Sequence, residues 1–121
     1  MPEVATSDDT AQRTAILSAL AILDELGGHS FKQEMLALFL FESPRQMAEL
    51  SSAVDRGDIR TAKRLAHTLK STASVFGVQA LGALALRVEK ELSIIGTVEA
   101  SQLLKTMESE YGRCAEIIRE M

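Results

Sequence analysis

Apolar side chains recur every three or four residues along almost the whole chain, which is the spacing of one face of an α-helix. Glycines interrupt the pattern at Gly27-Gly28, Gly57, Gly77 and Gly96, and glycine commonly stands just beyond the end of a helix. No stretch alternates between apolar and polar residues as a half-buried strand would. The pattern therefore predicts five helices, at residues 11–26, 30–56, 58–76, 78–95 and 98–119.

The last predicted helix has the most regular apolar face. Spacings of four and three alternate along one seam, which is formed by Ala100, Leu104, Met107, Tyr111, Cys114 and Ile118. Cys114 stands inside this seam, so we interpret it as a small buried hydrophobic residue rather than a reactive thiol. In the segment 30–56, Pro44 predicts a kink or local break near residues 41–43, because its ring clashes with the preceding turn.

The connections between the last four predicted helices are short, so consecutive helices are expected to be antiparallel neighbours. The prediction is an all-α fold, an up-down-up-down four-helix bundle with the helix 11–26 as an extra N-terminal helix packed at one end. We expect residues 1–10 to be a flexible segment. Residues 11–121 should form a single domain, because 121 residues leave no room for a second one.

Composition narrows the class of protein. Apolar residues make up 46% of the chain but only five are aromatic, so leucine, alanine, isoleucine, valine and methionine must build the core. A net charge of −4 argues against nucleic acid as the main partner, and no apolar run reaches the roughly 18–20 residues of a membrane span. The single cysteine excludes an intrachain disulfide, which suits a reducing compartment. We expect a monomeric cytoplasmic protein that binds neither nucleic acid nor membranes.

The segment 58–76 separates into an apolar and a polar face. Projection at 100° per residue places on the core side Ile59, Ala62, Leu65, Ala66, Leu69, Ala73 and Phe76. By the same helical geometry, His67 lies about 140° from the centre of that face. Its imidazole is therefore expected in solvent.

The surroundings of His67 are basic in an otherwise acidic chain. Between Arg56 and Lys70 there are five basic residues and one acidic residue, a local charge of +4, whereas the whole chain carries −4. Cations around one exposed imidazole suit a phosphoryl group and an acidic surface on a partner protein. The same pattern is also compatible with an ordinary solvated basic stripe that has no function.

The residues around His67 add a specific motif. The run from Ala66 to Gly77, AHTLKSTASVFG, resembles the signature of histidine phosphotransfer (Hpt) domains, in which A-H-x-L-K-G precedes small residues and a glycine ten positions after the histidine. Leu81 and the pair Val88-Glu89 are similar to the next helix of that family. The resemblance covers about residues 15–119, and its specific part is 62–89.

This resemblance implies a role in a two-component phosphorelay. His67 would accept a phosphoryl group on Nε2 from an aspartyl phosphate of a response-regulator receiver domain or a hybrid sensor histidine kinase, and would pass it to another receiver. Lys70 would neutralise phosphate oxygens, and Glu89 stands where the family has a residue that orients the imidazole by a hydrogen bond. The module itself would be no ATP-dependent kinase, and would need no cofactor because the receiver supplies Mg²⁺.

The docking surface is expected to surround the histidine. Arg60, Lys63 and Arg64 would provide charge. Ser71 and Ser74 would add little bulk, although the family usually has glycine at the position of Ser71. Apolar contacts are expected from Leu17, Leu20 and Leu86, because the first helix carries more apolar residues than one packed face needs.

Three other classes remain to be weighed. The dimerisation fragment of a histidine kinase also exposes a histidine on a helix, but a proline usually follows that histidine closely and residues 68–76 contain none. A non-catalytic adaptor that binds a receiver usually lacks the histidine. A metal carrier with a four-helix fold would need a Glu-x-x-His motif, which the sequence does not contain.

Overall fold

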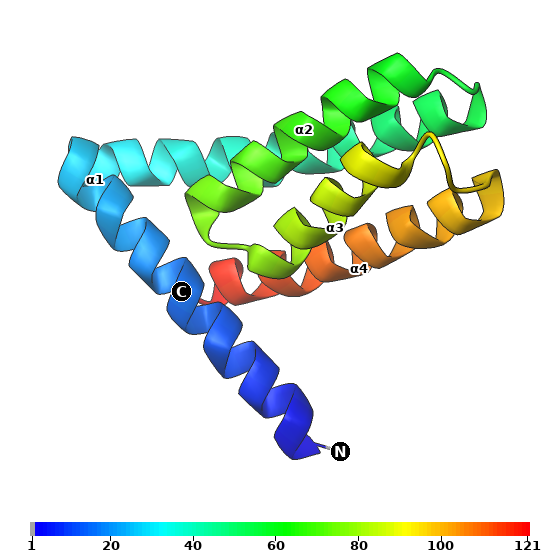
Figure 1. Ribbon diagram of the computed structural model, residues 1–121. Coiled ribbons are helices and arrows are strands. Elements are labelled where there is room, and N and C mark those ends of the chain that lie inside the picture. Colours follow the sequence, from blue (N-terminus) through cyan, green and yellow to red (C-terminus); the bar gives the residue numbers. More distant parts are fainter. Residues whose placement is uncertain (1) are drawn as a thin grey trace.

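The computed structural model describes the backbone of residues 2–121 and the side chains of residues 10–121. Its four helices are α1 (Pro2–Asp55), α2 (Ile59–Phe76), α3 (Gln79–Glu91) and α4 (Thr97–Glu120) (Figure 1). No strand occurs within residues 2–121, so the all-helical part of the prediction is confirmed. The flexible segment expected at residues 1–10 falls mostly on residues whose side chains lie outside the described part, and it stays a prediction.

Helix α1 replaces two of the five predicted helices. It runs through both 11–26 and 30–56, but its backbone is non-helical at Gly28, where φ is 86° and ψ is 179°. Glycine tolerates this positive φ because it has no Cβ. The chain therefore bends at Gly28 into a first arm before this residue and a second arm after it, and the two arms diverge in Figure 1. Asp24 and Lys32 form an ion pair of 3.5 Å across the bend.

Of the kink or local break expected near residues 41–43, the break is wrong, because α1 continues through Pro44 with helical backbone angles. A proline has no N–H, so the carbonyl of Leu40, four residues earlier, loses its usual helical donor. The hydroxyl of Tyr111 on α4 donates to that carbonyl oxygen at 3.1 Å. Burial raises the pKa of Tyr111, which keeps the phenol protonated and able to donate. A contact with a distant helix thus compensates for the proline.

The helices enclose one apolar core, in which α1 contacts α2 and α4, and α3 contacts the same two helices. The seam predicted on the last helix is buried throughout, and Cys114 lies within it fully covered. The predicted core face of α2 is buried too, except for Ile59, which is 38% exposed because it is the first residue of its helix. The helix predicted at 78–95 ends earlier, at Glu91, and a turn leads to α4.

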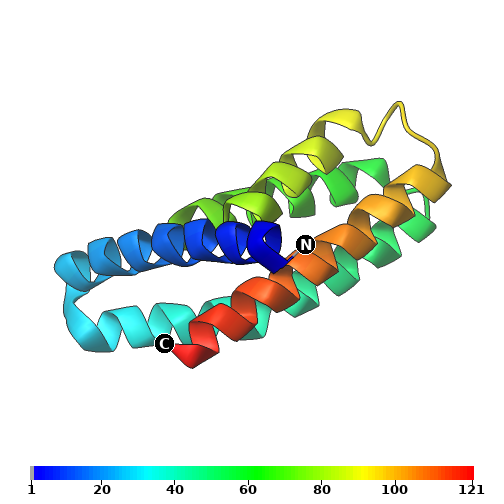
Figure 2. The same ribbon diagram turned by 90° about the horizontal axis from the view of Figure 1, so that it is seen from below.

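The first arm of α1 contacts the turn between α2 and α3. The side chain of Gln12 donates to the carbonyl of Gly77 at 2.8 Å, and Arg13 forms an ion pair of 3.1 Å with Glu120 near the end of α4. A Cβ on Gly77 would overlap the backbone carbonyl of Ala15, so this close approach requires glycine. The ion pair with Glu120 brings the first arm close to the C-terminal end of α4, whereas the N-terminal part of this arm runs away from the other helices (Figure 1 and Figure 2).

None of the helices, over the residues that the structure describes, is both long and apolar enough to cross a bilayer.

Candidate functional site

The position of His67 follows from the way α2 begins and ends. Asp58 caps the helix by accepting a hydrogen bond from the backbone N–H of Thr61 at 3.2 Å, and Gly77 ends it in the left-handed conformation. Between these caps, the flanking residues Leu65, Ala66 and Leu69 are buried in the core. The His67 side chain points the other way and is 59% exposed, as the helical projection predicts.

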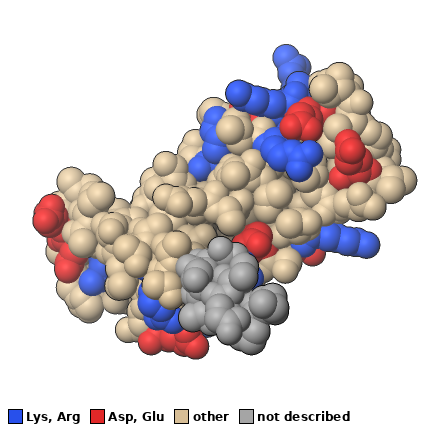
Figure 3. Space-filling model, turned by 60° about the horizontal axis from the view of Figure 1, so that its bottom comes forward, with Lys and Arg blue, Asp and Glu red and all other residues tan. Residues whose placement is uncertain are grey.

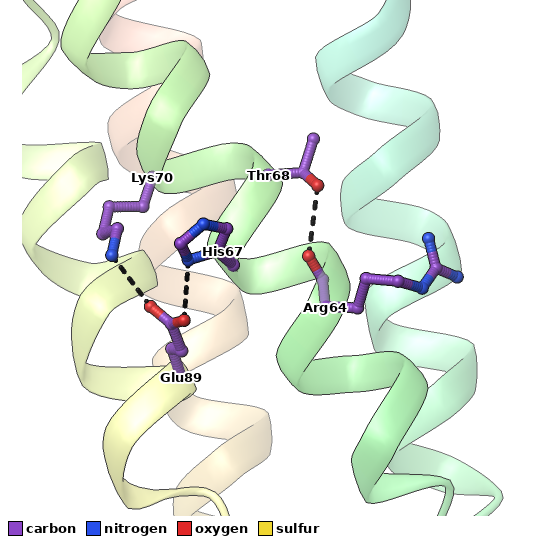
Figure 4. A network of polar contacts seen from close by, with 5 residues as sticks. All are labelled: Arg64, His67, Thr68, Lys70 and Glu89. Carbon is purple, nitrogen blue, oxygen red and sulfur yellow. Dashed lines mark hydrogen bonds and ion pairs between the residues drawn. The ribbon is translucent and has the colours of Figure 1, made fainter.

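Glu89 on α3 contacts the imidazole directly. Its Oε2 lies 2.7 Å from Nδ1 of His67, and the carboxylate reaches across the gap between the two helices (Figure 4). The neighbouring residue Val88 is almost completely buried, which places Glu89 at the edge of the core beside α2. The Glu89 side chain is 26% exposed, so water reaches this contact less freely than it reaches the ring.

Lys70 binds the other oxygen of the same carboxylate. Its Nζ lies 3.1 Å from Oε1 of Glu89, and its side chain is 33% exposed. The hydrogen bond from Lys70 is the largest of the effects that hold the pKa of Glu89 below 4.5, followed among the lowering effects by the contact with His67, while partial burial acts in the opposite direction. In this structure Lys70 thus has a carboxylate partner.

These contacts define which ring nitrogen is available. An ionised carboxylate can only accept hydrogen bonds, so Nδ1 of a neutral His67 must carry the proton that Glu89 accepts. The lone pair of the neutral ring is then on Nε2. In Figure 4 this second nitrogen faces away from Glu89. The site can therefore present a nucleophilic nitrogen to an incoming group.

Further cations lie on α2 before the histidine. Arg60 and Arg64 are exposed and Lys63 is half-buried, and among the described residues none of the three has an ion-pair partner. Figure 3 shows several Lys and Arg side chains, with Asp and Glu side chains among them, in the upper part of the view, where Figures 1 and 2 place α2 and α3. This surface can attract an anionic group or an acidic partner.

The hydroxyl of Thr68, directly after His67, does not take part in the contact with Glu89. It donates to the carbonyl of Arg64 on its own helix at 3.1 Å (Figure 4). Ser71 and Ser74 are both exposed.

The residues expected to dock a partner fall into two separate places. Ser74 and Leu86 line a cavity of about 330 Å³ between α2 and α3, and Lys70 lines it as well. Leu17 and Leu20 line a different cavity, of about 690 Å³, between the two arms of α1 and the end of α4. Leu17 is 51% exposed.

Leu20 is only 8% exposed and belongs to the core, so the expectation that it offers an exposed side chain is wrong. Some of the apolar residues that the first helix has beyond one packed face are therefore buried in the core, where they pack the first arm against the other helices.

The link between Lys70 and Glu89 is the feature that sequence reasoning missed. Both residues were singled out, but for separate roles, and their positions differ by 19 residues. The sequence feature that could have indicated this contact is the buried face of α3, because the buried residues Val88 and Leu92 place Glu89 beside α2.

Comparison with known families assigns the chain to one of them. The family model described as Hpt domain matches residues 34–113, about two thirds of the chain. The chain therefore belongs to the Hpt domain family, whose members are phosphotransfer intermediates, rather than kinases, in two-component signalling. Searches of curated proteins and of solved structures found no match.

Proposed function

We propose that this protein carries a phosphoryl group on His67 between receiver-domain aspartates of a two-component phosphorelay. The observation that supports this most strongly is the exposed imidazole of His67 with Glu89 Oε2 at 2.7 Å from its Nδ1. That contact leaves Nε2 free to react.

The transfer needs little machinery from this chain. The Nε2 lone pair attacks the phosphorus of an aspartyl phosphate, an N–P bond forms while the O–P bond breaks, and the bonding pair leaves with the aspartate carboxylate. The ring becomes positive as its lone pair forms the new bond, and Glu89 stabilises that charge through the proton on Nδ1. Donation to a second receiver is the reverse of this step. The Mg²⁺ ion is expected to be held by the receiver.

Lys70 is proposed to neutralise phosphoryl oxygens, since it stands one helical turn after His67 and its ammonium group is partly exposed. Arg60, Lys63 and Arg64 are proposed to attract the acidic face of the partner. Ser71, Ser74 and Leu86 are proposed to lie under the docked receiver, and Leu17 to extend the apolar contact.

The architecture that accompanies this function is an antiparallel up-down-up-down bundle. We propose that the second arm of α1 forms it together with α2, α3 and α4, and that the first arm is the extra helix at one end. The contacts of Gln12 with Gly77 and of Arg13 with Glu120 support this arrangement. Residues 11–121 would then be a single domain that acts as a monomer.

The test is transfer of radiolabel from a phosphorylated receiver domain to the purified protein. We expect a product that is labile in acid and stable in alkali, as an N–P bond is, and no label on His67→Ala. The matched control is His29→Ala, the other histidine of the chain, which should be labelled like the wild type. Full labelling of His67→Ala would contradict the proposal, and binding of the receiver without any labelling would favour a non-catalytic adaptor.

The role of Lys70 is tested in the same assay. Lys70→Ala should slow transfer while the circular dichroism spectrum stays that of a folded helical protein. Unchanged kinetics with an unchanged spectrum would remove Lys70 from the mechanism.

A further inference from the structure

The second arm of α1 leaves two large apolar side chains in solvent. Leu38 is 53% exposed and Phe41 is 62% exposed. A single exposed apolar side chain is ordinary on a protein surface, but these two stand three residues apart on one helix and therefore form a joint patch. Contiguous exposed apolar surface commonly marks a contact with another molecule.

Opposite charges flank this patch. Glu34 stands one turn before Leu38 and Arg45 one turn after Phe41, and both charged residues are exposed. At 100° per residue, the four side chains lie within about 60° of one another around the helix. They point away from the face that the arm buries in the core. We call these four residues, Glu34, Leu38, Phe41 and Arg45, the outer face of α1.

The order of residues along the outer face is symmetric. Leu38 and Phe41 are equally far from the peptide bond between residues 39 and 40, and so are Glu34 and Arg45. When two such helices pack antiparallel about a twofold axis at this bond, Leu38 of each copy faces Phe41 of the other, and Glu34 faces Arg45. The spacings of four, three and four residues are also those of a coiled-coil seam. A parallel pair would place like charges opposite each other, which is unfavourable.

Both charged side chains are available for such pairing. Among the described residues, Glu34 has no ion-pair partner. Arg45 contacts Glu42 on its own helix at 3.3 Å, and its guanidinium carbon lies 5.3 Å from the centre of the Phe41 ring. A guanidinium has five N–H donors, so Arg45 can keep its own contacts and also bind a carboxylate of a second copy.

We propose that the outer face of α1 is a self-association surface, through which two copies of this chain form an antiparallel dimer. One helix face from each copy is small beside the roughly 1,200–2,000 Å² that stable interfaces bury. The dimer is therefore weak, and dilute protein stays monomeric. In Figure 4, α1 and α3 lie on opposite sides of α2, and His67 points toward Glu89 on α3. Pairing through α1 thus leaves the imidazoles of both copies open, and it does not depend on the proposed phosphotransfer.

The first experiment measures the average mass of the full chain by sedimentation equilibrium, from micromolar to millimolar concentration. The mass should rise from that of one chain toward that of two. Phe41→Ala should raise the dissociation constant at least about tenfold, because each dimer loses two aromatic rings. The matched control is Ile94→Ala, which truncates an apolar side chain that is 82% exposed in the turn between α3 and α4, and it should leave the constant unchanged.

Charge reversals identify the partner and its orientation. Glu34→Arg and Arg45→Glu should each remain monomeric alone, because each places like charges opposite one another in the antiparallel pair. An equimolar mixture of the two variants should form a mixed dimer, and the double variant should dimerise like the wild type. Glu108→Arg makes the same reversal at an exposed position on α4 and should also dimerise like the wild type.

All these changes are made at exposed residues, and circular dichroism should show each variant as helical as the wild type. The mass of a single chain at every concentration would overturn the proposal, even if His67 is labelled by a receiver. A dissociation constant that Phe41→Ala leaves unchanged would also overturn it, since the contact would then lie on another surface. The absence of a mixed dimer would contradict the antiparallel pairing and the proposal with it.

Discussion

Pro44 lies in the second arm of α1, where the backbone stays helical, and Tyr111 supplies the Leu40 carbonyl with the hydrogen bond that the proline removes. The contribution of this hydrogen bond can be tested by a change in one atom. Tyr111→Phe deletes the hydroxyl that donates to the Leu40 carbonyl and keeps the ring, whose centroid lies 5.7 Å from that of Phe39. The Leu40 carbonyl is then left without a donor in a partly buried place. We expect the free energy of unfolding to fall by about 1–2 kcal/mol.

The measurement is urea unfolding followed by circular dichroism, in which this loss corresponds to a midpoint about 0.5–1 M lower. The cause is isolated by repeating the change in Pro44→Ala. Alanine supplies an N–H at position 44 that can donate to Leu40, so Tyr111→Phe should then cost less by roughly 1 kcal/mol. An equal cost in both backgrounds would refute the reasoning, because the hydroxyl would not be compensating for the proline.

Three further predictions concern the caps, the first arm and the ionised pair. Gly77→Ala should lower the free energy of unfolding by at least about 1 kcal/mol more than Gly57→Ala does, as measured by chemical unfolding. Both glycines have positive φ, but only a Cβ on Gly77 would meet the backbone of Ala15. Equal losses in the two variants would contradict the close approach of Ala15 to Gly77. Asp58→Ala should lower the midpoint of thermal unfolding, and Asp58→Asn should keep most of the wild-type midpoint, since the side-chain oxygen of either Asp or Asn can cap α2. An equal loss in Asp58→Asn and Asp58→Ala would argue against capping. The pKa of Glu89 is lowered in the folded protein, so its contribution to stability is present above pH 4.5 and lost as the pH falls through the folded pKa. Glu89→Gln should therefore flatten the decline in stability as the pH falls below 4.5, and an unchanged slope would contradict the ion pair.

The features that the sequence predicts well are set by local interactions. The ends of α2 lie within a residue of the prediction because Asp58 and Gly77 act on neighbouring backbone groups. The exposure of His67 follows from helical geometry once the apolar face is known. The seam on α4 is buried as expected because six apolar residues define its direction without ambiguity.

The errors concern interactions between distant residues. Pro44 predicts a break when only its own helix is considered, and the compensating donor, Tyr111, lies 71 residues beyond Leu40, whose carbonyl oxygen accepts its hydrogen bond. Leu20 was expected on the surface because the packing of the first arm on the other helices cannot be read from its own periodicity. The contact between Lys70 and Glu89 was missed for the same reason, since it depends on the register of α2 against α3.

The central claim is that Nε2 of an outward-facing His67 reacts while Glu89 holds Nδ1. The most direct test is ³¹P and ¹⁵N NMR of the protein after phosphorylation by a receiver domain, which identifies the nitrogen bonded to phosphorus. We predict a one-bond coupling between phosphorus and Nε2 of His67. Phosphorus bonded to Nδ1, or to any other residue, would contradict the account.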